Sequence, residues 1–172
     1  MISDSIAQKL NEQIQKEFYS AYLYLSMEAY FASENLDGFA NWFRVQAQEE
    51  RDHAMLIFDF INHVGGRVVL KQIDAPQVEF GSVEEVLKQS LQHEQFVTRS
   101  IYDIVELASE EKDHKTTAFL QWFVTEQAEE EANAESNLKK AQMVGVDGKG
   151  ILMLDQQMGQ RTYTPPSLVI DK

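Results

Sequence analysis

The chain has 172 residues, of which 44% are apolar and 10% aromatic, so it is long enough to bury the core of one domain. Its formal net charge of -13 argues against nucleic acid or an anionic membrane surface as a partner and favours cations. Because the sequence contains no cysteine, disulfides, thiolate metal sites and thiol nucleophiles are excluded.

The first ten residues include Asp4 and Lys9 and have no basic stretch that leads into an apolar run, so we expect no secretory signal. A first helix is predicted over about residues 5–34, with Ser5 as its candidate N-cap, before a polar turn at residues 35–38. No apolar run in the chain approaches the roughly 20 residues that a membrane span requires. We therefore expect a cytoplasmic protein without a membrane partner.

A second helix is predicted to begin at Phe39 and to end at the glycine pair 65–66. The next fifteen residues, 67–81, show no helical periodicity and can span up to roughly 50 Å when extended. A helix of about 28 residues is roughly 42 Å long, so this connection can cross from one end of a helical bundle to the other. The second and third helices are then parallel.

A third helix is predicted behind Ser82, an N-cap with Glu85 at the capping-box position, and it runs to about residue 111. A turn at residues 112–115 leads into a fourth helix, which stops before Gly145. Residues 148–159 are consistent with a short fifth helix. The expected fold is all-α: a four-helix bundle in about residues 5–144 with one long crossover between the second and third helices. Residues 145–172 add the short C-terminal helix and a tail to this single domain, 1–172.

Each of the four long predicted helices has an apolar face whose positions are spaced alternately by four and three residues. Polar side chains interrupt this face near the middle of every helix, at Glu17, at Glu50 with His53, at Glu94, and at Gln127 with Glu130. In a bundle with one crossover, these positions fall within roughly 10 Å of one level. Buried carboxylates without partners are too costly to be tolerated together, so a cationic partner is expected among them.

Charge balance gives the expected number of cations. Four buried carboxylates are neutralised by two divalent ions, and carboxylate oxygens with a single imidazole suit Fe(II) or Mn(II). Zn(II) can occupy the same ligands in vitro, although structural zinc sites prefer histidine and cysteine. The residues thus predict a dinuclear metal site, with iron as the first choice.

Ferritin-like di-iron proteins place one Glu on each of two helices and a Glu-x-x-His motif on each of the other two. Residues 50–53 supply one such motif, whereas residues 127–130 read Gln-Ala-Glu-Glu in place of the second. Together with Glu17, Tyr24 seven residues later, Glu94, the runs 49–53 and 126–130, the crossover and the short final helix, the chain resembles a bacterial non-haem ferritin. The resemblance covers essentially its whole length.

The resemblance implies roles for individual residues. One iron would be held by Glu17, Glu50 and His53, and the second by Glu50, Glu94 and Glu130, with Glu50 as the bridge. Gln127 would hydrogen-bond to oxygen species or water beside the pair, and Tyr24 would adjoin the site and supply an electron, with Trp122 as a weaker redox candidate. A third iron position nearby would use Glu49, Glu126 and Glu129 and share Glu130.

The resemblance also implies an activity. The protein would be an iron-storage ferroxidase that oxidises Fe(II) with dioxygen or peroxide and keeps Fe(III) oxyhydroxide inside a homo-oligomeric cage of 24 subunits. No haem is expected, because haem-binding bacterioferritins carry Met immediately after the motif Glu, where this chain has Arg51.

Other interpretations stay open at this point. Tyr24 can equally be a core tyrosine with a satisfied hydroxyl, Glu28 a structural hydrogen-bonding residue, and the outer glutamates a solvated helix face. His63, His93 and His114 are expected at the surface. The functional alternatives are a di-iron oxygenase or peroxidase that acts on an organic substrate, and a metal-free partner-binding bundle.

Overall fold

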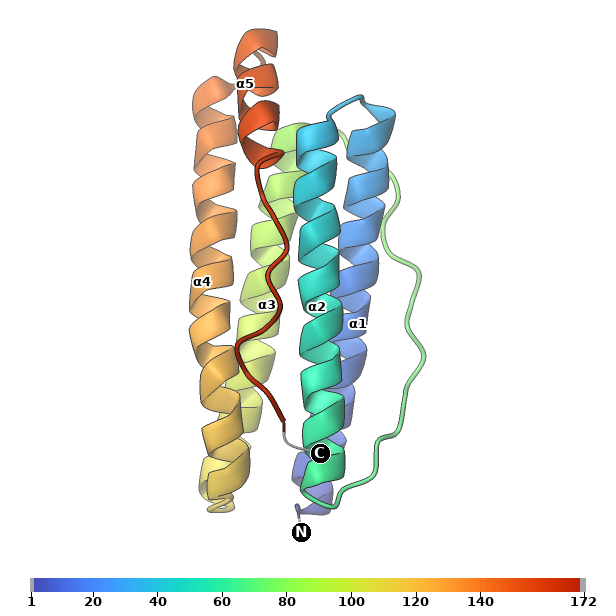
Figure 1. The fold of residues 1–172 in the computed structure, drawn as a ribbon, viewed down its shortest axis with the longest axis vertical. Coiled ribbons are helices and arrows are strands. Elements are labelled where there is room, and N and C mark those ends of the chain that lie inside the picture. Colours follow the sequence, from blue (N-terminus) through green and yellow to red (C-terminus); the bar gives the residue numbers. More distant parts are fainter. Residues whose placement is uncertain (1, 171–172) are drawn as a thin grey trace.

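Five helices make up the regular structure of the chain in a computed structural model that describes residues 2–170. They are α1 (Asp4–Ser33), α2 (Asp37–His63), α3 (Val83–Glu110), α4 (His114–Val144) and α5 (Gly148–Met158). Figure 1 shows α1 to α4 as long helices side by side, with the short α5 at one end. The predicted all-α bundle with a short fifth helix is confirmed. Within the described residues, no helix is long and apolar enough to cross a membrane.

Side-chain caps set the starts of three of the long helices, α1, α3 and α4. The Ser82 hydroxyl accepts a hydrogen bond from the backbone N–H of Glu85 at 3.2 Å, as predicted for α3. The prediction of Ser5 as the cap of α1 is wrong, because Ser3 accepts the Ile6 N–H and the Ser5 hydroxyl instead donates to Glu111. These differences move helix ends by one or two residues and leave the order of elements unchanged.

The long crossover after α2 runs back along α1 and makes α2 and α3 parallel (Figure 1). Near its start, the side chain of Asn11 on α1 accepts a hydrogen bond from Val69 N at 2.7 Å and donates one to Arg67 O at 3.0 Å. Near its end, Ser26 of α1 donates to Gln77 O at 2.6 Å. The crossover between the second and third helices is therefore confirmed, and α1 holds it in place.

The apolar core is divided into two clusters along the bundle. One contains Ile14, Ile57 and Phe123, with Phe60 and Phe119 stacked at 3.9 Å between ring centroids, among its buried members. The other contains buried residues nearer the α5 end, among them Tyr24, Phe43 and Leu138. On each long helix the sequence gap between the two clusters contains the polar residues that interrupt its apolar face. The polar side chains therefore lie between two apolar layers, away from the bundle ends.

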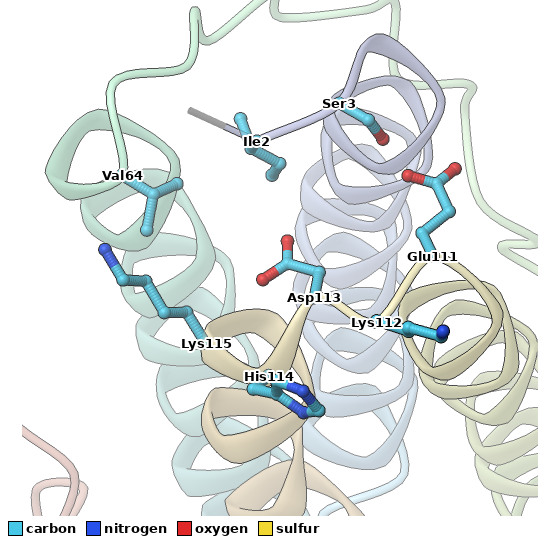
Figure 2. A pocket seen from close by; sticks show the side chains of 8 residues that line it. All are labelled: Ile2, Ser3, Val64, Glu111, Lys112, Asp113, His114 and Lys115. Carbon is cyan, nitrogen blue, oxygen red and sulfur yellow. The ribbon is translucent and has the colours of Figure 1, made fainter.

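The end of the bundle opposite α5 closes around a pocket of about 530 Å³ (Figure 2). It is bordered by the start of α1, the end of α2 and the turn between α3 and α4, and both acidic and basic side chains line it. Asp113 in this pocket caps α4 through the N–H of Thr116 at 3.1 Å. This pocket lies at the end of the bundle, away from the polar mid-bundle residues.

Helix α5 is attached to the start of α2 by a close backbone approach. The Asp155 carboxylate accepts the backbone N–H of Phe39 at 2.9 Å, where α2 has free N–H groups. At Gly38, a Cβ would lie only 1.7 Å from Asp155 O, so a side chain there is excluded. This contact fixes the start of the C-terminal tail, residues 159–170.

The tail descends from α5 along the bundle (Figure 1). Asn41 of α2 donates to Arg161 O at 3.0 Å, and the Tyr163 hydroxyl donates to the Asp52 carboxylate at 2.5 Å. Further along, the Trp122 indole N–H of α4 donates to the Ser167 hydroxyl at 3.0 Å. The tail is thus tied to both α2 and α4, over the middle of the bundle.

Candidate metal centre

The six polar side chains predicted to interrupt the apolar faces all lie in the interior. Each is less than a tenth exposed, and they come from all four long helices: Glu17, Glu50, His53, Glu94, Gln127 and Glu130. Their burial between the two apolar clusters removes water as a partner for their charges. Hydrogen bonds or a bound cation must therefore satisfy them.

Glu17, Glu50 and His53 present their ligand atoms to one another. One ligand atom from each residue lies within 4.8 Å of the other two, and the Glu50 Oε2 to His53 Nδ1 distance is 3.5 Å. Within residues 2–170, the buried side-chain polar atoms without a hydrogen-bond partner are Glu17 Oε2, Glu50 Oε2 and His53 Nδ1. Three unpartnered ligand atoms that face one another fit the requirements of a divalent cation.

Glu94 interacts electrostatically with Glu50, and both of its carboxylate oxygens are engaged by other neighbours. Its Oε1 accepts a short hydrogen bond from the Tyr24 hydroxyl, and its Oε2 accepts one from Gln127 Nε2 at 3.2 Å. The same Gln127 amide also donates to the Thr98 hydroxyl at 3.2 Å. Tyr24 and Gln127 therefore orient Glu94 through these hydrogen bonds.

Two glutamines that the sequence analysis did not select also hold the carboxylates. Gln46 Nε2 donates to Glu130 Oε2 at 2.8 Å and to Glu50 Oε1 at 3.2 Å, so one amide connects α2 with α4. Gln13 Nε2 donates to Glu17 Oε1 at 2.7 Å. Gln46 occupies the apolar face of α2, four residues before Glu50, which is a signal that could have identified it.

The pKa values of the centre show how strongly these charges interact without metal. Burial, followed by the charge of Glu50, raises the pKa of Glu17 to about 8, and the same two causes raise that of Glu130 to about 7. Burial and the neighbouring Glu50 and Glu130 raise the pKa of Glu94 well above its ordinary value. Burial opposes the charge of His53, but Glu50, Glu17 and Glu130 outweigh it and raise the pKa to about 10. The metal-free centre therefore holds protons where cations would otherwise bind.

Glu49, Glu126 and Glu129 line a second, outer region next to the centre. They border a pocket of about 410 Å³ that is also lined by Glu130 and His53. Burial raises the pKa values of Glu49 and Glu126, whereas Glu129 is exposed. The structure thus brings the three outer glutamates to one pocket, and two residues of the centre, Glu130 and His53, line the same pocket.

The remaining candidates lie apart from the ligand atoms. Glu28 accepts a hydrogen bond from Arg44 Nε at 2.7 Å, a structural role as expected. Trp122 lies edge-on to the His53 ring at 5.6 Å between centroids. The prediction of His93 as a surface residue is wrong: it is partly buried, contacts the Ser20 hydroxyl at 2.7 Å and meets the Tyr24 ring edge-on.

Comparison with known proteins agrees with this arrangement. The family model for the ferritin-like domain matches residues 7–144. A bacterial non-heme ferritin from Staphylococcus aureus (strain MRSA252) is 38% identical over 163 residues, which cover 95% of this chain and 98% of the relative. The corresponding protein from Staphylococcus epidermidis is 39% identical over the same shares of both chains.

Solved structures give the same family. An open-pore ferritin from the hyperthermophilic archaeon Archaeoglobus fulgidus has a TM-score of 0.93 and 46% identity, and covers 94% of this chain and 100% of its own. A humanized archaeal ferritin reaches a TM-score of 0.95 at 47% identity, covering 96% of this chain and 100% of its own. These matches span the bundle, the crossover and the metal-centre residues, so the chain belongs to the ferritin family.

Proposed function

We propose that this chain is the subunit of an iron-storing ferroxidase. Two Fe(II) ions bind as substrate, one held by Glu17, Glu50 and His53 and the other by Glu50, Glu94 and Glu130, with Glu50 between them. Each Fe(II) loses one electron, so the pair reduces dioxygen to hydrogen peroxide with uptake of two protons, or reduces peroxide to water. The Fe(III) product hydrolyses, releases protons and accumulates as oxyhydroxide within a cage of subunits, for which we propose 24 copies.

The observation that carries this proposal is the set of unpartnered buried atoms on Glu17, Glu50 and His53. A buried polar group without a hydrogen bond costs about 1–3 kcal/mol, and three such atoms gather here, two of them on the Glu50–His53 ion pair, which supports a bound cation at this place. The donors are chiefly carboxylate oxygens, which hold the harder Fe(III) better than Fe(II) and so favour oxidation.

The neighbouring pocket favours an inorganic substrate over an organic one. Its walls include four glutamates, whereas sites for organic substrates are mostly apolar with a few polar groups. A di-iron oxygenase acting on a carbon substrate would need an apolar cavity beside Glu94 or Glu130. The pocket that Glu94 and Glu130 both line has a volume of only about 10 Å³, too small for such a substrate, and the larger pocket beside Glu130 is the acidic one.

The central test is aerobic oxidation of Fe(II) by Glu50→Ala, followed as the rise in Fe(III) absorbance. We expect loss of the rapid phase, because the change removes the ligand common to both positions. Glu28→Ala is the matched control, since Glu28 is a bundle glutamate bonded to Arg44 outside the centre. An unchanged rapid phase in Glu50→Ala would contradict the site assignment. Anaerobic soaking of crystals with Fe(II), followed by anomalous scattering, would count the bound ions directly.

Storage is tested separately from oxidation. We expect light scattering to show a large closed assembly that keeps many Fe(III) ions per chain in solution. Particles of only one or two subunits that release insoluble Fe(III) would overturn the storage function, while ferroxidase chemistry at the centre would stand.

A further inference from the structure

Arg161 in the C-terminal tail carries a positive charge into the outer acidic pocket. Its Nη2 donates to Glu49 Oε2 at 2.5 Å, and its Nη1 donates to Gln46 Oε1 at 2.6 Å. The guanidinium also lies 4.2 Å from the ring centroid of Trp42. With only 14% of its side chain exposed, Arg161 has three specific partners and is more than a loose surface ion pair.

The tail keeps this guanidinium over the pocket. Asn41 holds the tail backbone at Arg161 through a hydrogen bond to its carbonyl oxygen. Two further hydrogen bonds hold the following residues of the tail, one from Tyr163 to Asp52 and one from Trp122 to Ser167. Residues 164–167, which include two prolines, form one side of the pocket opposite the glutamates. The tail therefore covers the outer pocket as an ordered segment. The two prolines reduce the conformational entropy that the tail loses when it packs against the bundle.

The covered pocket has room and charge for another cation. Its volume of about 410 Å³ exceeds the roughly 200 Å³ that six waters and an ion occupy at about 30 Å³ per water. Glu49, Glu126, Glu129 and Glu130 line it, so a single guanidinium leaves an excess of carboxylates. Glu49, however, already has Arg161 as a partner, and a cation that uses Glu49 must replace that contact.

Arg161 also reaches the centre through one intermediate side chain. Because it holds Gln46 Oε1, the amide nitrogen of Gln46 points to Glu50 and Glu130. Release of Arg161 would free Gln46 Oε1 and remove the contact that fixes the amide orientation. Occupation of the outer pocket is thereby connected to the carboxylate that both central positions share.

We propose that Arg161 is a resident counter-cation of the outer pocket, which holds Glu49 until a divalent cation displaces it and so lowers the affinity of that position. The exchange involves no covalent chemistry. The guanidinium gives up its hydrogen bond to Glu49, and the cation binds the carboxylate that is freed. This inference rests on the proposed function and adds to it a third metal position in the outer pocket, which the resemblance implies, and the way that position is controlled.

Calorimetric titration of the assembled, metal-free protein with Zn(II), which undergoes no redox reaction, tests the proposal at low salt. We expect two tight equivalents and one weaker one in the wild type. Arg161→Gln should tighten the weaker equivalent roughly tenfold, about 1.4 kcal/mol, since a charge-assisted hydrogen bond to Glu49 no longer competes. Arg44→Gln is the matched control, because it removes the same charge from an exposed position on α2.

Tryptophan emission gives a second readout that is independent of affinity. In a Trp122→Phe background the remaining tryptophan is Trp42, which lies under Arg161. The weaker Zn(II) equivalent should change its emission in the wild-type tail and leave it unchanged in Arg161→Gln. If Arg161→Gln does not assemble, Arg161→Lys should show smaller tightening, because lysine keeps the charge but loses the forked contact.

The outcomes separate this inference from the proposed function. Equal or weaker binding of the third equivalent in Arg161→Gln, with Arg44→Gln behaving as the wild type, would overturn the role of Arg161. Absence of the two tight equivalents in the wild type would instead overturn the di-metal function itself.

Discussion

Replacing Glu17 by glutamine probes how much the metal centre destabilises the metal-free protein. The change keeps the size of the side chain and its contact with Gln13, and supplies an N–H that can donate to the unpartnered Glu50 Oε2. The pKa of Glu17 rises from 4.5 to about 8, a difference of about 3.5 units. At about 1.4 kcal/mol per unit, full ionisation of this group costs the folded protein about 5 kcal/mol.

The sign of the pH dependence follows from the direction of the shift. Because the pKa of Glu17 is higher in the folded than in the unfolded chain, the folded state binds more protons between about pH 4.5 and about pH 8. The free energy of unfolding is therefore highest below this window and falls as pH rises through it. Between about pH 5.5 and about pH 7.5, Glu17 alone accounts for a loss on the order of 3 kcal/mol. His53, whose pKa is raised to about 10, adds a loss of the same sign above about pH 6.5.

Scanning calorimetry of chelator-treated protein at the two pH values measures this effect. We expect the melting temperature of Glu17→Gln to exceed that of the wild type by about 8–16 °C near pH 7.5 and by only about 3–6 °C near pH 5.5, at roughly 2–4 °C per kcal/mol. Added Zn(II) should reverse the order, because the wild type gains more from binding. Glu28→Gln serves as the control. If the melting temperature of Glu17→Gln changes with pH as that of the wild type does, ionisation of buried Glu17 does not destabilise the metal-free protein, and the reasoning is refuted.

Three further predictions concern the same architecture. Zn(II) binding near pH 7 should release more than one proton per subunit, because Glu17, Glu94 and His53 hold protons in the metal-free protein; binding heats that are identical in buffers of different ionisation enthalpy would contradict this. Tyr24→Phe should assemble normally but oxidise Fe(II) severalfold more slowly, since Glu94 loses its donor, and unchanged stopped-flow kinetics would leave Tyr24 a packing residue. Gly38→Ala should detach α5 and change Trp42 emission, whereas Gly148→Ala, whose Cβ would meet nothing within 4 Å, should behave as the wild type.

The sequence predicts the bundle well because its signals are local and periodic. Spacings of three and four residues mark the buried face of each helix, and almost all positions on those faces are buried, including Phe31 on α1 and Ile101 on α3. The length of the crossover settles the direction of α3, since only a long connection can return the chain to the other end of the bundle and make α3 parallel to α2. Glu17, Glu50, His53, Glu94 and Glu130 follow from the same periodicity, because a charge on a buried face is conspicuous.

What the sequence does not predict depends on contacts between distant segments. Arg161 pairs with Glu49 across 112 residues, and nothing in the local pattern of the tail indicates that partner. His93 lies beside the buried face of α3 and is covered by Ser20 and Tyr24 of α1, so the periodicity of its own helix places it at the surface. Helix ends move by a residue or two for a related reason: Ser3 and Ser5 are both plausible caps, and packing against Glu111 decides between them.

The departure of α4 from the second Glu-x-x-His motif has a consequence for the direction of iron movement. Under the proposed function, the second metal position has only oxygen ligands, because Glu130 occupies the last position of that motif, while the first position includes the His53 imidazole. Oxygen ligands favour Fe(III), and both positions border the outer pocket, the first through His53 and the second through Glu130. Under the proposed function, the position that best holds the oxidised product therefore shares a carboxylate with the acidic pocket under Arg161. A carboxylate common to both places lets Fe(III) move outward by ligand exchange, and the guanidinium, which repels cations and occupies Glu49, keeps the outer pocket from trapping that product.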